Sequence, residues 1–167
     1  MNALETKKIS LREIIGQGYD DFWKSKKRYL VVKGSRASKK STTAALKIIV
    51  RMMQHPLANT LVVRQTAESL KDSCFAQLRW AIDRLGVGNF WKARVSPLEL
   101  EYLPTGQKII FRGLDNPLKI TSITVKSGHL CWVLLEEAYE ITEEAFNRID
   151  ESLRGQMPDD LYIQWLI

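Results

Sequence analysis

Cysteine and histidine are scarce in this sequence of 167 residues, which contains two of each. Cys74 and Cys131 lie far apart in apolar surroundings, a pattern typical of buried free thiols in a reducing compartment and not of a disulfide. Two histidines exclude a histidine-rich metal centre. No apolar run is long enough to span a bilayer, and the first residues lack the apolar segment of a secretory signal. We therefore expect a cytoplasmic protein that is neither secreted nor inserted in a membrane.

The remaining composition is that of a globular protein, with 45% hydrophobic and 26% charged residues. The length suffices for one domain with a proper core and is too short for two. We expect residues 1–28 to form a lead-in that packs on the core, and residues 29–167 to form the domain. The net charge of +6 favours polyanionic partners, above all nucleic acid, although many soluble proteins are basic.

A basic loop after the first apolar run, Tyr29–Val32, is the centre of the sequence. Gly34, Lys40 and Ser41 match the phosphate-binding pattern G-x-x-x-x-G-K-[ST], and a helical pattern follows. Such a loop wraps phosphates with backbone N–H groups at the positive end of a helix. Lys39 stands where the pattern has its second glycine. The predicted nucleotide-binding residues are Gly34, Ser35, Arg36, Ala37, Ser38, Lys39, Lys40, Ser41 and Thr42. The alternative is an ordinary basic turn ahead of a helix.

Two carboxylates end a second apolar run, residues 130–135, about a hundred residues later. A phosphate-binding loop needs such acids, at the tip of a neighbouring strand, for Mg²⁺ and for the attacking water. We assign Glu136 to Mg²⁺ together with Ser41, and Glu137 to the water. Lys40 is expected to reach the β and γ phosphates of ATP, and the guanidinium of Arg36 to bind the γ phosphate with two hydrogen bonds. The alternative is two glutamates on a solvated loop before a helix.

The order of the predicted elements indicates a mostly parallel sheet with crossover helices. Strands are predicted at 29–33, 60–64, 130–135 and 161–167, helices at 41–53, 67–85 and 142–153, and a hairpin at 98–103 and 108–112. Residues 118–125 are ambiguous between strand and loop. With the phosphate-binding loop, this order predicts an α/β P-loop NTPase fold of the RecA/ASCE-like type, a three-layer sandwich with an inserted β-hairpin. The apolar run that ends the chain predicts a domain cut before its next segment.

Several further residues are candidates for roles in the site. Arg64, Arg112 and Arg154 lie at predicted strand or helix ends, where each could be an arginine finger or sensor, although each is individually more typical of a structural residue. An aromatic or cationic residue before the first strand could stack on the base. The candidates are Phe22, Trp23 and Arg28, although such aromatics more often pack a helix onto the core.

Four segments resemble phage terminase large subunits. The loop at 33–41 is similar to the family's P-loop, which often carries an inner arginine. Residues 61–65 with 69–73 resemble the next strand and helix, residues 111–115 with 119–120 resemble the hairpin exit, and residues 133–138 resemble the family's pair of acids followed by alanine. The resemblance covers roughly residues 25 to 167. It extends to the ATPase half only, because the nuclease acids and the asparagine-bearing coupling segment have no counterpart.

The resemblance implies an ATPase that drives double-stranded DNA into a procapsid, in the cytoplasm of an infected host cell. It also implies a portal protein, a small terminase subunit and the procapsid as partners, and a ring on the portal, while the isolated ATPase part is compatible with a monomer. A RecA-like helicase or translocase is a second hypothesis. A degenerate P-loop module that binds DNA or proteins without hydrolysis is a third, motivated by Lys39 and the missing downstream segment.

Overall fold

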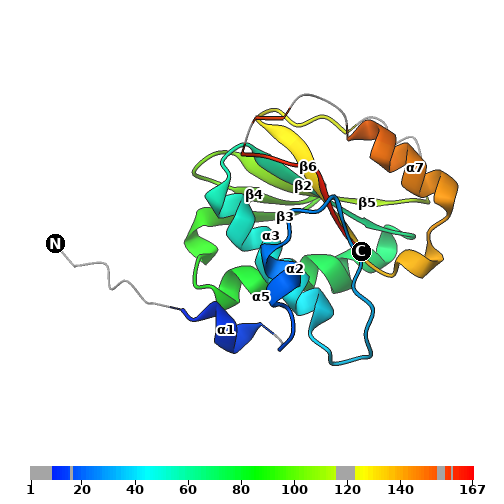
Figure 1. Ribbon diagram of the computed structural model, residues 1–167. Helices are drawn as coiled ribbons and strands as arrows, with labels where there is room; N and C mark the ends of the chain where they lie inside the picture. The colour runs from blue at the N-terminus through cyan, green and yellow to red at the C-terminus, as the bar shows by residue number, and fades with distance from the viewer. Residues whose placement is uncertain (1–8, 16, 116–122, 154–156, 159) are drawn as a thin grey trace.

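The computed structural model describes residues 9–15, 17–115, 123–153, 157–158 and 160–167. Within them, one sheet of seven strands has the order β1-β7-β6-β2-β5-β4-β3 (Figure 1). The strands are β1 (Tyr29–Leu30), β2 (Ala58–Arg64), β3 (Trp91–Val95), β4 (Leu98–Tyr102), β5 (Gln107–Gly113), β6 (His129–Leu135) and β7 (Gln164–Leu166). The helices are α1 (Leu11–Ile14), α2 (Asp20–Lys24), α3 (Lys40–Gln54), α4 (Glu68–Leu70), α5 (Ala76–Arg84) and α7 (Glu143–Ser152).

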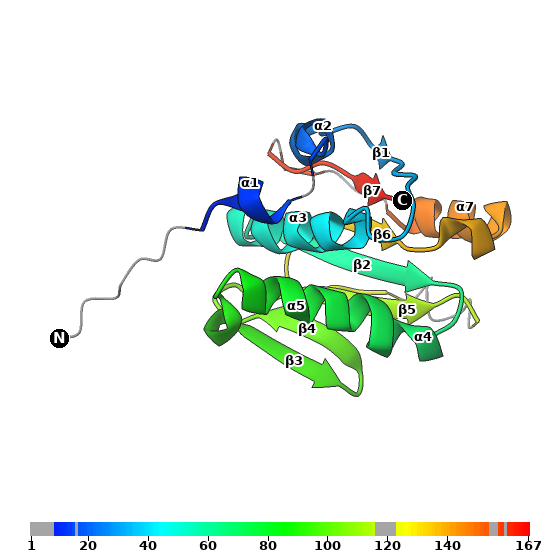
Figure 2. The same ribbon diagram turned by 90° about the horizontal axis from the view of Figure 1, so that it is seen from below.

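Helices cover both faces of the sheet, as Figures 1 and 2 show, so the predicted three-layer α/β fold is confirmed. The alternation of side chains along β2 explains how one strand serves both layers. Val62 belongs to the core cluster shared with α3 and α5. Leu61 and Val63 belong to the cluster on the other face, which includes Ile149 of α7. No helix of the described residues is long and apolar enough to cross a membrane.

Five strands, β1, β7, β6, β2 and β5, run parallel. Strand β4 extends the sheet antiparallel to β5, and β3 pairs antiparallel with β4. The predicted hairpin is confirmed as β4 and β5, but it is part of a three-stranded antiparallel unit. The sequence interpretation missed β3, although residues 91–95 alternate apolar and polar side chains. Two alternations are a weak signal beside the longer apolar runs elsewhere.

The first strand, predicted at residues 29–33, is wrong in its length, and it is not the buried strand that its apolar residues indicate. Only Tyr29–Leu30 form β1, which pairs with β7 at the edge of the sheet, and the side chain of Val31 is 72% exposed. The last strand is also shorter than predicted, because β7 comprises Gln164–Leu166 only. Residues 116–122, which hold part of the ambiguous segment and of the family-like segment at 119–120, lie outside the described residues.

The predicted helix at 67–85 is confirmed in its extent but not in its regularity. A π-helical turn, η1 (Lys71–Phe75), separates α4 from α5. Short 3-10 turns, η2 (Gly88–Phe90) and η3 (Ala138–Glu140), follow α5 and β6. Helix α7 begins as predicted, with the Thr142 hydroxyl accepting a hydrogen bond of 3.3 Å from the Ala145 N–H.

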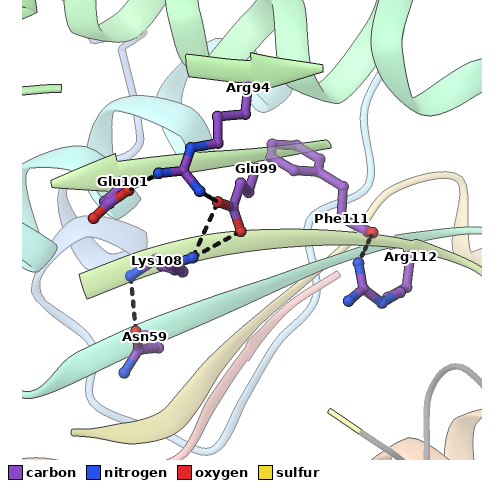
Figure 3. Close-up of polar contacts among 7 residues, drawn as sticks. All are labelled: Asn59, Arg94, Glu99, Glu101, Lys108, Phe111 and Arg112. Carbon is purple, nitrogen blue, oxygen red and sulfur yellow. Dashed lines mark hydrogen bonds and ion pairs between the residues drawn. The ribbon is translucent and has the colours of Figure 1, made fainter. Parts of the chain in front are cut away.

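An ion-pair cluster covers the antiparallel part of the sheet (Figure 3). The carboxylate of Glu99, which is buried, accepts hydrogen bonds of 3.0 Å from Arg94 and from Lys108. Arg94 also pairs with Glu101 at 3.1 Å. The backbone N–H of Lys108 donates to the side-chain oxygen of Asn59 at 2.8 Å, which joins β5 to β2. These contacts fix the antiparallel unit to the parallel sheet.

Candidate nucleotide-binding site

The loop predicted to bind phosphate and the paired acids line one cleft of about 910 Å³ at the carboxyl ends of β1 and β6. Lys40 and Glu136 both face this cleft, so the two segments meet although they are far apart in sequence. We expected the acids at the tip of a strand adjacent to the one before the loop. Strand β7 instead lies between β1 and β6 in the sheet. Ligands of open α/β sheets bind in this position, and the volume is typical of small-molecule sites.

The loop has an unusual backbone for residues with a side chain. Ala37 and Lys39 have φ angles of 64° and 62°, in the left-handed region that favours glycine. Lys39 is the N-cap residue of α3 and stands at the position where the pattern has glycine. A non-glycine residue in this conformation costs about 1 kcal/mol. At the position of the second glycine, the loop therefore has the backbone conformation that glycine favours, although the residue there is Lys39.

The ammonium group of Lys40 closes the loop from inside. It donates to the carbonyl oxygen of Gly34 at 2.5 Å, to that of Ser35 at 3.2 Å and to the Ser38 hydroxyl at 3.5 Å. Because Lys40 begins the 15-residue helix α3, its charge lies beside the positive end of the helix dipole. This arrangement attracts anions such as phosphate.

Helix α2 supports the loop from the N-terminal side. The Tyr19 hydroxyl, just before α2, donates to the carbonyl oxygen of Ser38 at 2.9 Å. Of the three candidates for stacking on a base, Phe22 and Trp23 both pack against the core, and Phe22 also lines the cleft. Arg28 instead binds the carboxylate of Asp150 at 2.7 Å.

The two acids have different surroundings. The half-buried carboxylate of Glu136 accepts a hydrogen bond of 2.9 Å from the thiol of Cys74. Glu137 is exposed, has a φ of 55° and forms an ion pair with the guanidinium of Arg64. Ser41 and Glu136 also line a smaller cleft of about 470 Å³ beside the first. Hydroxyl and carboxylate oxygens are the ligands that Mg²⁺ prefers, so the residues present fit this ion.

The three candidate arginines lie in different places. Arg64 lies beside the acids and also donates to the Ser73 hydroxyl at 3.0 Å. Arg112 lies on β5, where it donates to the carbonyl oxygen of Phe111 at 2.8 Å, and burial lowers the pKa of Arg112. Figure 3 shows this contact of Arg112 with Phe111, and no dashed line joins Arg112 to the ion pairs around Glu99. Arg154 lies outside the described residues. Arg36 lines the cleft and is exposed.

Sequence reasoning missed the contacts of Tyr19, Ser73 and Cys74 with the site. Each contact joins residues whose sequence spacing carries no motif, such as the 62 residues between Cys74 and Glu136. Cys74 and Cys131 are the buried free thiols that the sequence predicted.

The fold and the cleft define a class, the α/β proteins with a mostly parallel sheet and a cleft at the carboxyl ends of its strands. Comparison with known proteins narrows this class. The family model described as phage terminase large subunit matches residues 26–165. The large terminase subunit of Bacillus phage SPP1 is 40% identical in an alignment 159 residues long, which covers 91% of this chain and 37% of that protein. The chain therefore belongs to the phage terminase large subunit family.

Solved structures share the fold at low sequence identity. The large terminase of a thermophilic bacteriophage has a TM-score of 0.62 at 13% identity, covering 84% of this chain and 33% of that chain. The complex of that terminase with ADP has a TM-score of 0.57 at 14% identity, covering 83% of this chain and 32% of that chain. The RNA helicase Prp28 of Chaetomium thermophilum, bound to ADP, has a TM-score of 0.52 at 14% identity, covering 84% and 36%. This chain thus spans about a third of the length of the proteins it matches.

Proposed function

We propose that this chain binds ATP with Mg²⁺ and hydrolyses it as the ATPase part of a motor that packages viral DNA. The observation that carries the proposal is the single cleft lined by Lys40, Glu136 and Glu137. Membership of the phage terminase large subunit family supports the packaging role. The ADP complex of the thermophilic phage terminase supports a nucleotide as the ligand, since the two chains share this fold.

Each group in the cleft has a role in this proposal. The loop from Gly34 to Thr42 surrounds the phosphates, and Lys40 exchanges its carbonyl partners for phosphate oxygens. Ser41 and Glu136 would hold Mg²⁺, which offsets the negative charge of the phosphates. Glu137 accepts a proton from the attacking water while the oxygen of that water bonds to the γ phosphorus. The bond between the γ phosphorus and the β–γ bridging oxygen breaks at the same time, and ADP is the leaving group. Arg36 stabilises the charge on the transferred phosphoryl group.

Double-stranded DNA is the proposed polymeric substrate, and its phosphates suit the net charge of +6. The portal protein, the small terminase subunit and the procapsid are the proposed partners, with a ring of subunits on the portal. Family membership supports these assignments, which concern the assembled motor.

The test is ATP binding and turnover by Lys40→Ala. We expect the variant to lose most of its affinity for ATP and to hydrolyse none, because the loop loses the charge that contacts phosphate. Lys27→Ala is the matched control, since Lys27 is exposed and lies away from the cleft. Wild-type ATP turnover, with or without double-stranded DNA, that Lys40→Ala leaves intact would refute the assignment.

A P-loop module that binds nucleotide without hydrolysis is the second candidate function. Two observations favour it: Lys39 holds a glycine conformation, and Glu137 is engaged by Arg64. It predicts that the protein binds ATP·Mg²⁺ in calorimetry but releases no phosphate even when DNA is present. A helicase is less well supported, because the sequence relationship is to terminases and the likeness to Prp28 extends to the fold alone.

A further inference from the structure

We propose that Cys74 is a positioning residue, which holds the carboxylate of Glu136 through a thiol hydrogen bond so that Glu136 can bind a divalent cation. This inference rests on the proposed function, which assigns Glu136 to the metal. Cys74 itself is not a metal ligand in this proposal. It acts only through the carboxylate that it contacts.

The geometry of the contact is that of a donor held rigidly in the core. The sulfur of Cys74 lies 2.9 Å from Oε2 of Glu136, and Cys74 is 1% exposed. A protonated thiol donates one hydrogen bond, and here that bond goes to a carboxylate.

The π-helical turn that carries Cys74 connects to both acids of the site. Cys74 contacts Glu136, and the preceding residue, Ser73, accepts a hydrogen bond of 3.0 Å from Arg64, the partner of Glu137. Phe75 fixes the other end of the turn in the core, since its ring lies edge-on to that of Phe111 at 5.3 Å between centroids. π-Helical turns are rare and occur often at functional sites.

The consequence for metal binding follows from the freedom of the Glu136 side chain. Glu136 and Ser41 line the same cleft, so a carboxylate held in place is already directed to the site where the cation would bind. Without the thiol, Glu136 samples other rotamers and must be ordered when the cation binds. Loss of a group that orients a metal ligand typically weakens metal binding by about tenfold or more.

The experiment measures Mn²⁺ affinity by electron paramagnetic resonance in the presence of ADP, and ADP affinity in the absence of any divalent cation. We expect Cys74→Ala to weaken Mn²⁺ binding about tenfold while leaving metal-free ADP binding unchanged. Cys74→Ser keeps a hydroxyl donor at the same place and should restore Mn²⁺ affinity to within about threefold of the wild type.

Cys131→Ala is the matched control. Cys131, on strand β6, is also a buried free thiol, with 0% exposure, but it lines neither cleft. Its substitution creates a similar cavity without removing a contact to Glu136. Mn²⁺ affinity should therefore equal that of the wild type. If Cys74→Ala does not fold, Cys74→Val fills the space without a donor, and the comparison of valine with serine replaces that of alanine with serine.

The outcomes separate this inference from the proposed function. Equal Mn²⁺ affinities in the wild type, Cys74→Ala and Cys131→Ala would overturn the role of Cys74 while leaving the nucleotide site intact. Equal losses in the alanine and serine variants would also overturn it, since they would indicate packing and not donation. A wild-type protein that binds neither ADP nor Mn²⁺ would remove the proposed function, and the inference with it.

Discussion

The guanidinium of Arg64, at the end of β2, forms an ion pair with the carboxylate of Glu137, just beyond β6. The two strands are parallel neighbours with Val63 opposite Leu135, so the register brings Arg64 to Glu136, and Glu137 is the next residue along the chain. The backbone N–H of Glu136 continues the ladder by donating to the carbonyl oxygen of Val63 at 3.3 Å. The carboxylate that we propose as the general base is therefore held by an arginine of the same chain.

A double-mutant cycle with Arg64→Met and Glu137→Gln should show that this ion pair stabilises the folded protein. Arg64 is largely buried, with 13% of its side chain exposed, while Glu137 is 40% exposed. We expect a coupling free energy of about 1 kcal/mol in urea unfolding, above that of a typical surface pair.

The exposed pair of Arg148 and Glu144, four residues apart on α7, is the control for that cycle. Its side chains are 52% and 75% exposed, and its coupling should be below about 0.5 kcal/mol. Couplings of equal size for the two pairs would contradict a special role for Arg64 in holding Glu137.

Lys39→Gly should stabilise the protein, since glycine adopts the left-handed conformation of Lys39 without strain. We expect a gain of about 0.5–1 kcal/mol in the free energy of unfolding. Gly106→Ala is the opposite control, because Gly106 has a φ of 74° and an added Cβ meets nothing within 4 Å. That variant should lose about 1 kcal/mol through strain alone.

Comparison of Lys39→Gly with Lys39→Ala separates backbone from charge in nucleotide binding. Both variants remove the ammonium group, but only glycine removes the strain. If the charge of Lys39 helps to hold phosphate, both variants should bind ATP more weakly and to the same degree. Unchanged ATP affinity in both would limit Lys39 to a structural role in the loop.

The elements that the sequence predicted well are those with long apolar patterns. Helix α3 buries seven consecutive residues and strand β6 buries five, and such runs leave few alternatives. Strand β3 has only five residues, mostly exposed, and β1 is shorter still. Their pairing depends on strands that are distant in sequence, so local periodicity could not predict it. The π-helical turn was missed because the apolar residues around it still recur at nearly helical spacing.

The candidate site divides in the same way. The loop and the two acids could be proposed from motifs, because their chemistry requires particular residues at close spacing. The supporting contacts from Tyr19, Ser73 and Cys74 could not, because each depends on how separate elements pack. Lys47 illustrates the same limit, since its helical pattern indicated only a buried helix and not a lysine buried within it.

Gly113→Ala should destabilise the protein strongly, because the end of β5 passes very close to the segment after β2. A Cβ at Gly113 would lie 2.3 Å from the backbone nitrogen of Ala67 and 2.7 Å from its Cα. Backbone atoms cannot rotate away as a side chain can, so we expect a loss of about 2–4 kcal/mol in urea unfolding.

Gly88→Ala is the matched control, since its Cβ would come no closer than 3.7 Å to a neighbouring atom, Oδ1 of Asp83. Its stability should lie within about 0.5 kcal/mol of the wild type. Similar losses in the free energy of unfolding for the two alanine variants would show that the close approach to Ala67 is not the reason for glycine at position 113.

Lys47, on α3, should make stability depend on pH. Its side chain is buried, and its ammonium group donates to the carbonyl oxygens of Phe22 and, at 3.4 Å, of Ser25. Burial, and after it the positive charge of Arg51, lower the pKa of Lys47 from 10.5 to about 7. Between pH 7 and 10.5 the unfolded chain therefore binds more protons at this lysine than the folded protein does, so raising the pH stabilises the folded state.

Comparison with Lys47→Met isolates this contribution. The free energy of unfolding of the wild type, relative to that of the variant, should be flat below about pH 7 and rise above it, by up to about 1.4 kcal/mol per pH unit. Urea unfolding at about pH 6, 8 and 10 measures the difference. Lys71→Met is the control for the loss of one charge, because Lys71 is exposed. Parallel curves for the wild type and Lys47→Met would show that Lys47 keeps its proton in the folded protein, held by the two carbonyl oxygens.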